Sequence, residues 1–363
     1  MLKKILNLFK GWHEKKIVLL LLGTGSTLVL GGIAKEWWLP ILIPLINNQF
    51  NQDIPLPDDS IDYVVFAIGL VLIGLGIWFY FKTKEKRKLQ TMLQIRHSSI
   101  EAGDYSKVDV DLSNYNIEPF SIIQTEELKN INEQNLQHAL REQDKIVQKI
   151  LQRLDGHTDI EVSYWGLAHI PLLVLLGYQI ADKSNSSYFE WNQNFLKWEK
   201  VKEKSEVCPP LMLEEDISKQ TVDETKEVIV RIGVTYPIHE TDLNGLDLDK
   251  FNSFYLHLKP PHRNAIKCME QLNEYQKQFR QLLDKINQTY PHLEKIHLFY
   301  SGQPSLAYRL GSTISPRMDK EIWVYNHLGI ASPKYNWAIN LQKAGNPVKI
   351  KITGANQIGN EES

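Results

Sequence analysis

The pattern of hydrophobic and polar positions divides this 363-residue chain into a membrane-like part and a soluble part. Residues 17–34 and 63–81 contain no charged residue. At about 1.5 Å per residue, each run is just long enough to cross a hydrocarbon core roughly 30 Å thick. From residue 105 onward, short apolar runs alternate with runs of helical period. The pattern therefore predicts a two-helix transmembrane hairpin, with a connecting loop at 35–62, in front of a soluble α/β region.

The stretch 295–326 shows most clearly how the soluble region is built. Residues 296–300 alternate as in a buried strand, Pro304 suits the first turn of a helix over 305–313, and a second strand follows at 321–325. Strand, tight loop, helix and strand make a parallel βαβ unit, which needs further strands beside it.

A second copy of this unit lies upstream. Residues 159–166 match 295–302 in apolar, aromatic and glycine positions, and Gly177 corresponds to Gly311. The other matches keep the same order: 120–123 with 254–257, the helical run 126–154 with 262–289, and 188–192 with 322–326. Because the order is shared, the sequence predicts two fused Rossmann-like halves.

These patterns define the expected domains. The membrane module covers residues 1–83 and begins with a basic amphipathic stretch, 1–16, suited to a lipid interface. The further boundaries are a polar helical stalk at 84–104, a first Rossmann-like half at 105–199, a linker at 200–225, and a second half with its tail at 226–363. The linker lysines Lys200, Lys202 and Lys204 are expected to be solvated rather than to form a binding patch.

The charges around the predicted hairpin indicate its orientation. Basic residues flank the two spans at 3–16 and 82–88, whereas the loop between them has Lys35 as its basic residue and several aspartates. The positive-inside rule then places both termini in the cytoplasm. A signal peptide ending near Ala34 is the alternative, but the apolar run is longer than a usual signal core.

Small residues suggest how the predicted spans pack. Gly23, Thr27 and Gly31 recur every fourth residue, a spacing that lets helix backbones approach closely within the hairpin or between copies. Tyrosine is the one ionisable residue type in the spans, which argues against an ion pathway or a proton relay.

Composition and motifs exclude several functions. A net charge of −2 excludes a generally basic nucleic-acid binder, so DNA is not an expected partner. The chain has no P-loop, HExxH or GxSxG motif, and Cys208 and Cys268 lack metal-site spacing and are expected as reduced thiols. We therefore expect no catalytic residue, no metal site and no cofactor.

The soluble region carries a family resemblance. The segments IHLFYSGQPSLAYRLGSTISP, IWVYN and YNWAINL resemble the second half of a SAVED domain, and GLAHIPLLVLLGYQIAD resembles its first half. The resemblance covers roughly residues 105–345. It implies a duplicated fold related to CRISPR-associated Rossmann sensors, which detects a cyclic oligonucleotide in CBASS anti-phage defence. With its membrane module, the chain is similar to SAVED effectors that have two transmembrane helices.

The resemblance also implies partners and a location. The ligand would be a cyclic oligonucleotide made by a cognate nucleotidyltransferase, and binding would drive self-association of the sensor domains. The effector would then disrupt the bacterial inner membrane. Two alternatives remain open: a membrane-tethered enzyme that cleaves a cyclic oligonucleotide, and a passive membrane scaffold.

Candidate ligand-binding residues follow from where such a fold binds anions, at the carboxyl ends of its strands and the N-termini of its helices. They are Trp165, His169, Tyr236, Lys259, Arg263, Ser301, Gln303, Pro304 and Ser305. Aromatic rings could stack on bases, and basic side chains could pair with phosphates. His169 could instead only cap or pack its helix. We expect the strand ends of both halves to converge, so that Trp165 and Gln303 line one cavity.

Overall fold

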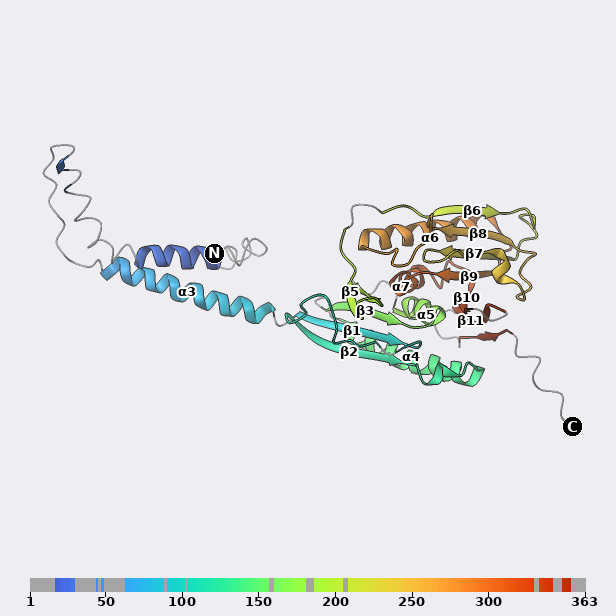
Figure 1. Cartoon of the computed structure of the whole chain (residues 1–363), viewed down its shortest axis with the longest axis horizontal. Helices are drawn as coiled ribbons and strands as arrows, with labels where there is room; N and C mark the ends of the chain where they lie inside the picture. Colours follow the sequence, from blue (N-terminus) through green and yellow to red (C-terminus); the bar gives the residue numbers. More distant parts are fainter. Residues whose placement is uncertain are drawn as a thin grey trace. The chain divides into compact units, whose positions relative to one another are not determined.

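The computed structural model describes the chain at residues 17–29, 44, 47–48, 63–87, 90–101, 103–156, 160–180, 186–204, 208–329, 333–341 and 348–353. It forms two compact units (Figure 1). A first unit comprises residues 1–90 with 113–115, and a second unit comprises 91–112 with 116–363. The predicted loop 35–62, the start 1–16 and the tail from 354 lie almost wholly outside the described residues.

The first unit contains two apolar helices, Ile17–Val29 and α3 (Tyr63–Arg87). Among the described residues, α3 is the one helix that is long and apolar enough to cross a membrane, over Val65–Lys82. Residues 30–34 of the predicted first span lie outside the described residues. The two-span hairpin therefore stays a prediction.

Glycines mark the contact between these two helices. A Cβ at Gly25 would lie 2.9 Å from the carbonyl oxygen of Gly69, and a Cβ at Gly69 would lie 2.9 Å from that of Gly25. Gly23, in contrast, has no neighbour within 4 Å of a built Cβ among the described atoms, and Gly31 is not described. Within the described residues, Gly23 therefore takes no part in the contact between the two helices.

Replacing Gly25 by leucine should therefore separate the two helices, whereas Gly23→Leu should not, because close backbone approach leaves no room at Gly25. The measurement is oxidative crosslinking between cysteines introduced at Leu22 and Gly76, which touch across the pair, in a chain without its native cysteines. Equal crosslinking in both variants would contradict this packing.

The second unit is a mixed α/β fold, as predicted, and it contains two sheets. The five-stranded sheet has the order β2-β1-β3-β4-β5 and the seven-stranded sheet the order β12-β11-β10-β9-β7-β8-β6. The bounds in the first half are β1 (Gln90–Ser98), β2 (Tyr115–Ile123), η1 (Glu127–Lys129), α4 (Glu133–Leu154), β3 (Glu161–Leu167), α5 (Ile170–Ile180), β4 (Ser186–Asn192) and β5 (Lys197–Lys200). Those in the second half are β6 (Met212–Asp216), β7 (Glu227–Gly233), η2 (Glu240–Leu243), β8 (Asn252–His257), α6 (Met269–Thr289), β9 (Lys295–Ser301), α7 (Pro304–Thr313), β10 (Glu321–His327), β11 (Tyr335–Leu341) and β12 (Ile350–Ile352).

The element order shows the predicted duplication. The series β1-β2-α4-β3-α5-β4-β5 returns as β7-β8-α6-β9-α7-β10-β11, and the equivalent strands are neighbours in both sheets. The βαβ unit is parallel in each copy, β3 with β4 and β9 with β10. One predicted match is wrong in register: Val162 pairs with Ser186, while its counterpart Leu298 pairs with Val324. Tyr188 is therefore not the equivalent of Ile322.

Two predicted boundaries are corrected. Residues 90–98 are not a helical stalk but the strand β1, which pairs in parallel with β3 and buries Leu93 and Ile95 completely. Without β1, the backbone N–H and C=O groups along one edge of β3 would have no partner strand. The hydrogen bonds that β1 makes with β3 therefore favour a strand here, although the predicted stalk is polar. The predicted linker also contains β6, which pairs with β8. Its Glu215 forms an ion pair with Lys285.

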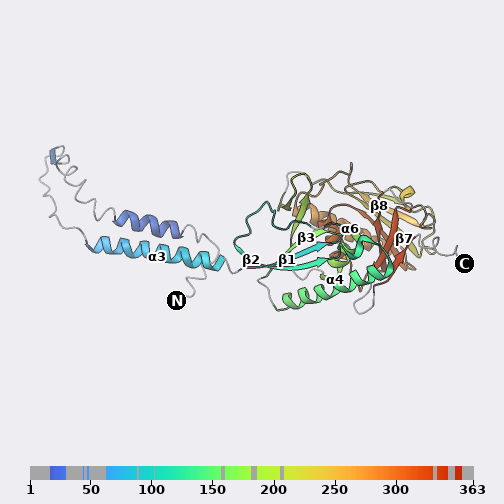
Figure 2. The same cartoon turned by 60° about the horizontal axis from the view of Figure 1, so that its bottom comes forward.

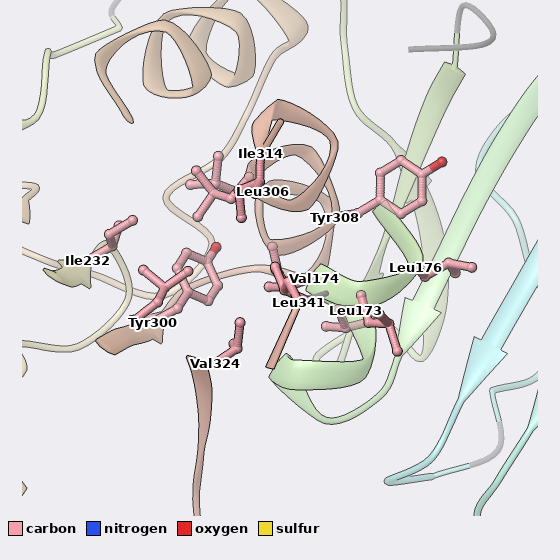
Figure 3. Close-up of a cluster of buried hydrophobic side chains, with 14 of the residues drawn as sticks. Leu173, Val174, Leu176, Ile232, Tyr300, Leu306, Tyr308, Ile314, Val324 and Leu341 are labelled. Carbon is pink, nitrogen blue, oxygen red and sulfur yellow. The ribbon is translucent and has the colours of Figure 1, made fainter. Parts of the chain in front are cut away.

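The core lies between the inner faces of the two sheets. Helix α4 runs beside β1 and β2 (Figure 2), and the buried apolar side chains of helices α4 to α7 belong to one cluster with strands of both halves. Figure 3 shows part of this cluster, where Val174 of α5 and Leu306 of α7 lie with Val324 and Leu341 of the second sheet. The halves thus share one core.

Helices α5 and α7 cross at a pair of glycines. A Cβ at Gly177 would lie 1.9 Å from the carbonyl oxygen of Tyr308, and a Cβ at Gly311 would lie 1.9 Å from that of Val174. The contact is reciprocal, as expected for two copies of one helix packed face to face. It explains why glycine stands at both positions that the sequence comparison matched.

Candidate functional site

Three predicted residues meet at the carboxyl end of β7 and β9. The backbone N–H of Tyr236 donates to Ser301 Oγ over 3.1 Å. Arg263 Nε donates to the Tyr236 hydroxyl, and its guanidinium lies 5.5 Å from the centre of that ring. Arg263 and Lys259 are exposed. The structure therefore brings Tyr236, Arg263 and Ser301 together, and their role in ligand binding stays a prediction.

Gln303 holds the loop after Arg263 against α7. Its Oε1 accepts the backbone N–H of Ile266 at 2.5 Å, and its own carbonyl accepts the Tyr300 hydroxyl at 2.8 Å. Pro304 then opens α7, and its fixed φ suits that position. Gln303 is buried, and its hydrogen bonds give it a structural role in joining the loop to the start of α7.

The N-terminal turn of α7 has an internal acceptor. The Ser305 backbone N–H donates to Glu190 Oε1 over 2.9 Å, across from the first half to the second. Burial raises the pKa of Glu190 to about 7, although hydrogen bonds from Ser305 and Gln303 act in the opposite direction. A carboxyl group at this position uses the N–H groups and dipole that a helix N-terminus offers to anions.

A pocket of about 780 Å³ opens beside this turn, between the two halves. Its lining comes from β4, β5 and the segment after β5 in the first half, and from the loop before α6 and the start of α7 in the second. The residues are Asp109, Glu190, Trp191, Asn192, Glu199, Lys200, Val201, Lys202, Lys204, Asn264, Ile266, Lys267 and Gln303. In the described part of the chain, none of the four lysine ammonium groups has a carboxylate within ion-pair distance. They are available to an anionic ligand.

The predicted cavity shared by Trp165 and Gln303 is wrong. Trp165 is fully buried on the outer face of the first sheet, stacked on Phe189 with ring centres 3.9 Å apart, and its Nε1–H donates to Ser163 Oγ. Neighbouring residues of a strand point to opposite faces, so Tyr164 faces the core and Trp165 faces away from it. Trp165 is therefore covered by protein and has no free ring face for a base.

His169 fills the start of α5. Its Nδ1 lies 2.7 Å from Ser99 Oγ, its backbone N–H bonds the same oxygen, and its ring lies 5.9 Å from that of Trp337. Burial lowers the pKa of His169 to about 4, so the imidazole is neutral at pH 7. These contacts fit the alternative that His169 caps or packs the start of its helix.

Most residues of this pocket are not among the predicted ligand-binding residues. Lys200, Lys202 and Lys204 lie in the predicted solvated linker, and Glu190 and Lys267 carry no predicted role. The sequence does contain one indication of the pocket: from the end of β5, lysines occur at every second residue. Side chains at this spacing lie on the same side of an extended chain. The contribution of the loop before α6 has no such local signal.

A protein-family model matches residues 143–341, just over half of the chain. It is SAVED, described as "SMODS-associated and fused to various effectors sensor domain". A search of curated proteins gives no match.

Solved structures that the chain matches include Cap4 SAVED/CARF-domain containing receptors. The receptor of Acinetobacter baumannii with the cyclic trinucleotide 3′3′3′-cAAA is 15% identical, with a TM-score of 0.48 and coverage of 82% of this chain and 64% of that chain. The receptor of Moraxella osloensis is 13% identical, with a TM-score of 0.42 and coverage of 84% and 64%. The chain therefore spans a little under two thirds of the length of these receptors.

Proposed function

The chain belongs to the SAVED family, and from this membership we propose that its second unit senses a cyclic oligonucleotide and that its first unit passes the signal to a membrane. The observation that carries the proposal is the lysine-rich pocket between the halves. Its volume lies within the roughly 300–1,000 Å³ typical of ligand sites in proteins.

The chemistry of the pocket suits a ligand with several phosphates. Lys200 comes from β5 of the first half, whereas Lys267 comes from the loop before α6, where Lys202 forms a β-bridge to Cys268. Lysines from both halves could therefore hold two phosphates of one ring. Lysine binds phosphate as a point charge, and the α7 N-terminus adds backbone donors. Asn192 and Asn264 can hydrogen-bond base edges.

For the membrane step, we propose that ligand binding assembles several copies, and that their apolar helices together disrupt a bacterial inner membrane in anti-phage defence. This includes the predicted two spans with both termini in the cytoplasm. The apolar helix α3 supports a membrane location by its length and composition.

The ligand should raise the melting temperature of the full-length chain in detergent. At a ligand concentration 100 times Kd, binding to the native state adds about 2.7 kcal/mol of stability. For a domain of this size that corresponds to roughly 5–10 °C. The first probe is 3′3′3′-cAAA, the cyclic trinucleotide held by the Acinetobacter receptor, followed by a panel of cyclic di- and trinucleotides. No shift with any of them would contradict the sensor proposal.

The same samples separate the remaining alternatives. Intact cyclic ligand recovered after incubation supports a sensor, whereas linear product would support a nucleotide-processing enzyme. Mass photometry with and without the bound ligand tests assembly, and an unchanged oligomer together with full permeabilisation of vesicles would exclude it.

A further inference from the structure

Glu190 is one of three carboxyl groups, with Asp109 and Glu199, in a pocket that also contains four lysines. It lies on β4, beside lysines that are free of carboxylate partners, and its carboxyl group accepts the Ser305 N–H at the first turn of α7. That N–H is one of the backbone donors that a helix N-terminus presents to an anion. The carboxyl group therefore holds the position where a ligand phosphate would be most favoured.

We propose that Glu190 is an internal competitor for the ligand phosphate, so that the protein binds its anionic ligand well when this carboxyl group is neutral and poorly when it is ionised. The inference rests on the proposed function, and adds to it a residue that sets affinity and makes it depend on pH.

The groups around Glu190 determine whether ligand affinity rises or falls as the pH increases. Burial raises its pKa to about 7, so its ionised fraction grows from a small to a dominant share between about pH 6 and pH 8.5. The charged groups that share its pocket are Asp109, Glu199, Lys200, Lys202, Lys204 and Lys267. Tyr164 and Tyr300 also face its charge, and burial holds the pKa of both phenols well above the usual value, so they stay neutral in this range.

The size of the effect follows from the neutral fraction. If the ligand binds only the neutral form, apparent affinity falls in proportion to that fraction, by up to roughly thirtyfold from about pH 6 to pH 8.5 for a pKa near 7. The phosphodiesters of a cyclic oligonucleotide do not titrate in this range, so the ligand adds no slope of its own.

Glu190→Gln is the direct test. The amide oxygen can still accept the Ser305 N–H, but it carries no charge at any pH. Affinity for 3′3′3′-cAAA, or for whichever cyclic oligonucleotide raises the melting temperature, is measured on the full-length chain in detergent at about pH 6 and pH 8.5 and at constant ionic strength. The wild type should lose affinity by about five- to thirtyfold, while the variant should keep it and bind more tightly than the wild type at pH 8.5.

Glu199→Gln is the matched control. Glu199 pairs directly with Glu190 across β4 and β5 and lines the same pocket, but its carboxylate forms an ion pair with Lys197 instead of accepting the Ser305 N–H. Its loss removes the same charge, so binding should tighten at both pH values while the fall with pH remains. Thermal unfolding checks that both variants are folded.

The outcomes are distinct. A wild-type affinity that does not change with pH, or an equal fall in the wild type and Glu190→Gln, overturns the role of Glu190 while leaving the sensor in place. Absence of binding of any cyclic di- or trinucleotide at both pH values overturns the proposed function itself.

Discussion

Gly311→Ala is expected to lower the free energy of unfolding of the second unit by about 3 kcal/mol. The added methyl group would lie 1.9 Å from the Val174 carbonyl oxygen. A backbone atom cannot avoid this clash by changing rotamer as a side chain can, so the two helices must move apart. Overpacking of this kind costs about 1–3 kcal/mol and sometimes more, and alanine recovers at most about 1 kcal/mol as a better helix former. Thermal unfolding of the chain in detergent should show a melting temperature roughly 6–12 °C lower.

The control is Ser312→Ala, one residue along the same helix, which adds no atom to the crossing and removes a hydroxyl bonded to the Arg309 carbonyl. Its effect should stay within about 1 kcal/mol. Gly177→Ala should resemble Gly311→Ala, and the double variant should cost less than their sum, because either methyl group already forces the helices apart. If both glycine variants were as stable as the wild type, α5 and α7 would be able to move apart without loss of stability, and the prediction would be wrong.

The double variant Lys200→Ala with Lys267→Ala should lose ligand affinity by at least about a hundredfold. It removes one cation from each half of the pocket, and a hydrogen bond to a charged group contributes about 1.5–3 kcal/mol. Affinity is measured by calorimetry at low and at moderate salt. The loss should be larger at low salt, since added salt already screens part of the attraction in the wild type.

Lys149→Ala with Lys277→Ala provides the comparison. These lysines are exposed on α4 and α6, one in each half, and removing them changes the net charge equally. Their loss should alter affinity by less than about threefold. A comparable loss from both pairs would indicate attraction by the net charge of the chain rather than contacts in the pocket.

The fold could be predicted largely from the sequence because its two halves repeat. A shared order of strand, helix and glycine positions is visible in the sequence itself, and it aligns Gly177 with Gly311, the two glycines at which α5 and α7 cross. The pairing of residues 188–192 with 322–326 failed because two short aromatic strands look alike at several registers. Strand β1 was missed because a polar segment that follows an apolar helix resembles its continuation.

The pocket could be predicted only in part, since its walls come from segments far apart in the chain. Gln303 was found from its place after a strand, but Glu190 reaches Ser305 from the other half, and only the packing of the halves brings them together. Trp165 shows the opposite error: its position in the sequence suited a ligand, while the loop residue Tyr105 and the neighbouring Trp198 cover it.

The duplicated unit is alike in architecture but unlike at its two helix starts. Beside α7 lies the lysine-lined pocket, whereas at the start of α5 His169 is hydrogen-bonded to Ser99. If the proposed assembly joins copies through two unlike surfaces, they form a row that continues until a rotation closes it into a ring. If the first unit is the proposed membrane anchor, a dimer would bring two such anchors together and stop there. A directed row would gather one more anchor with every chain that joins, so the load on the bilayer would grow with the length of the row.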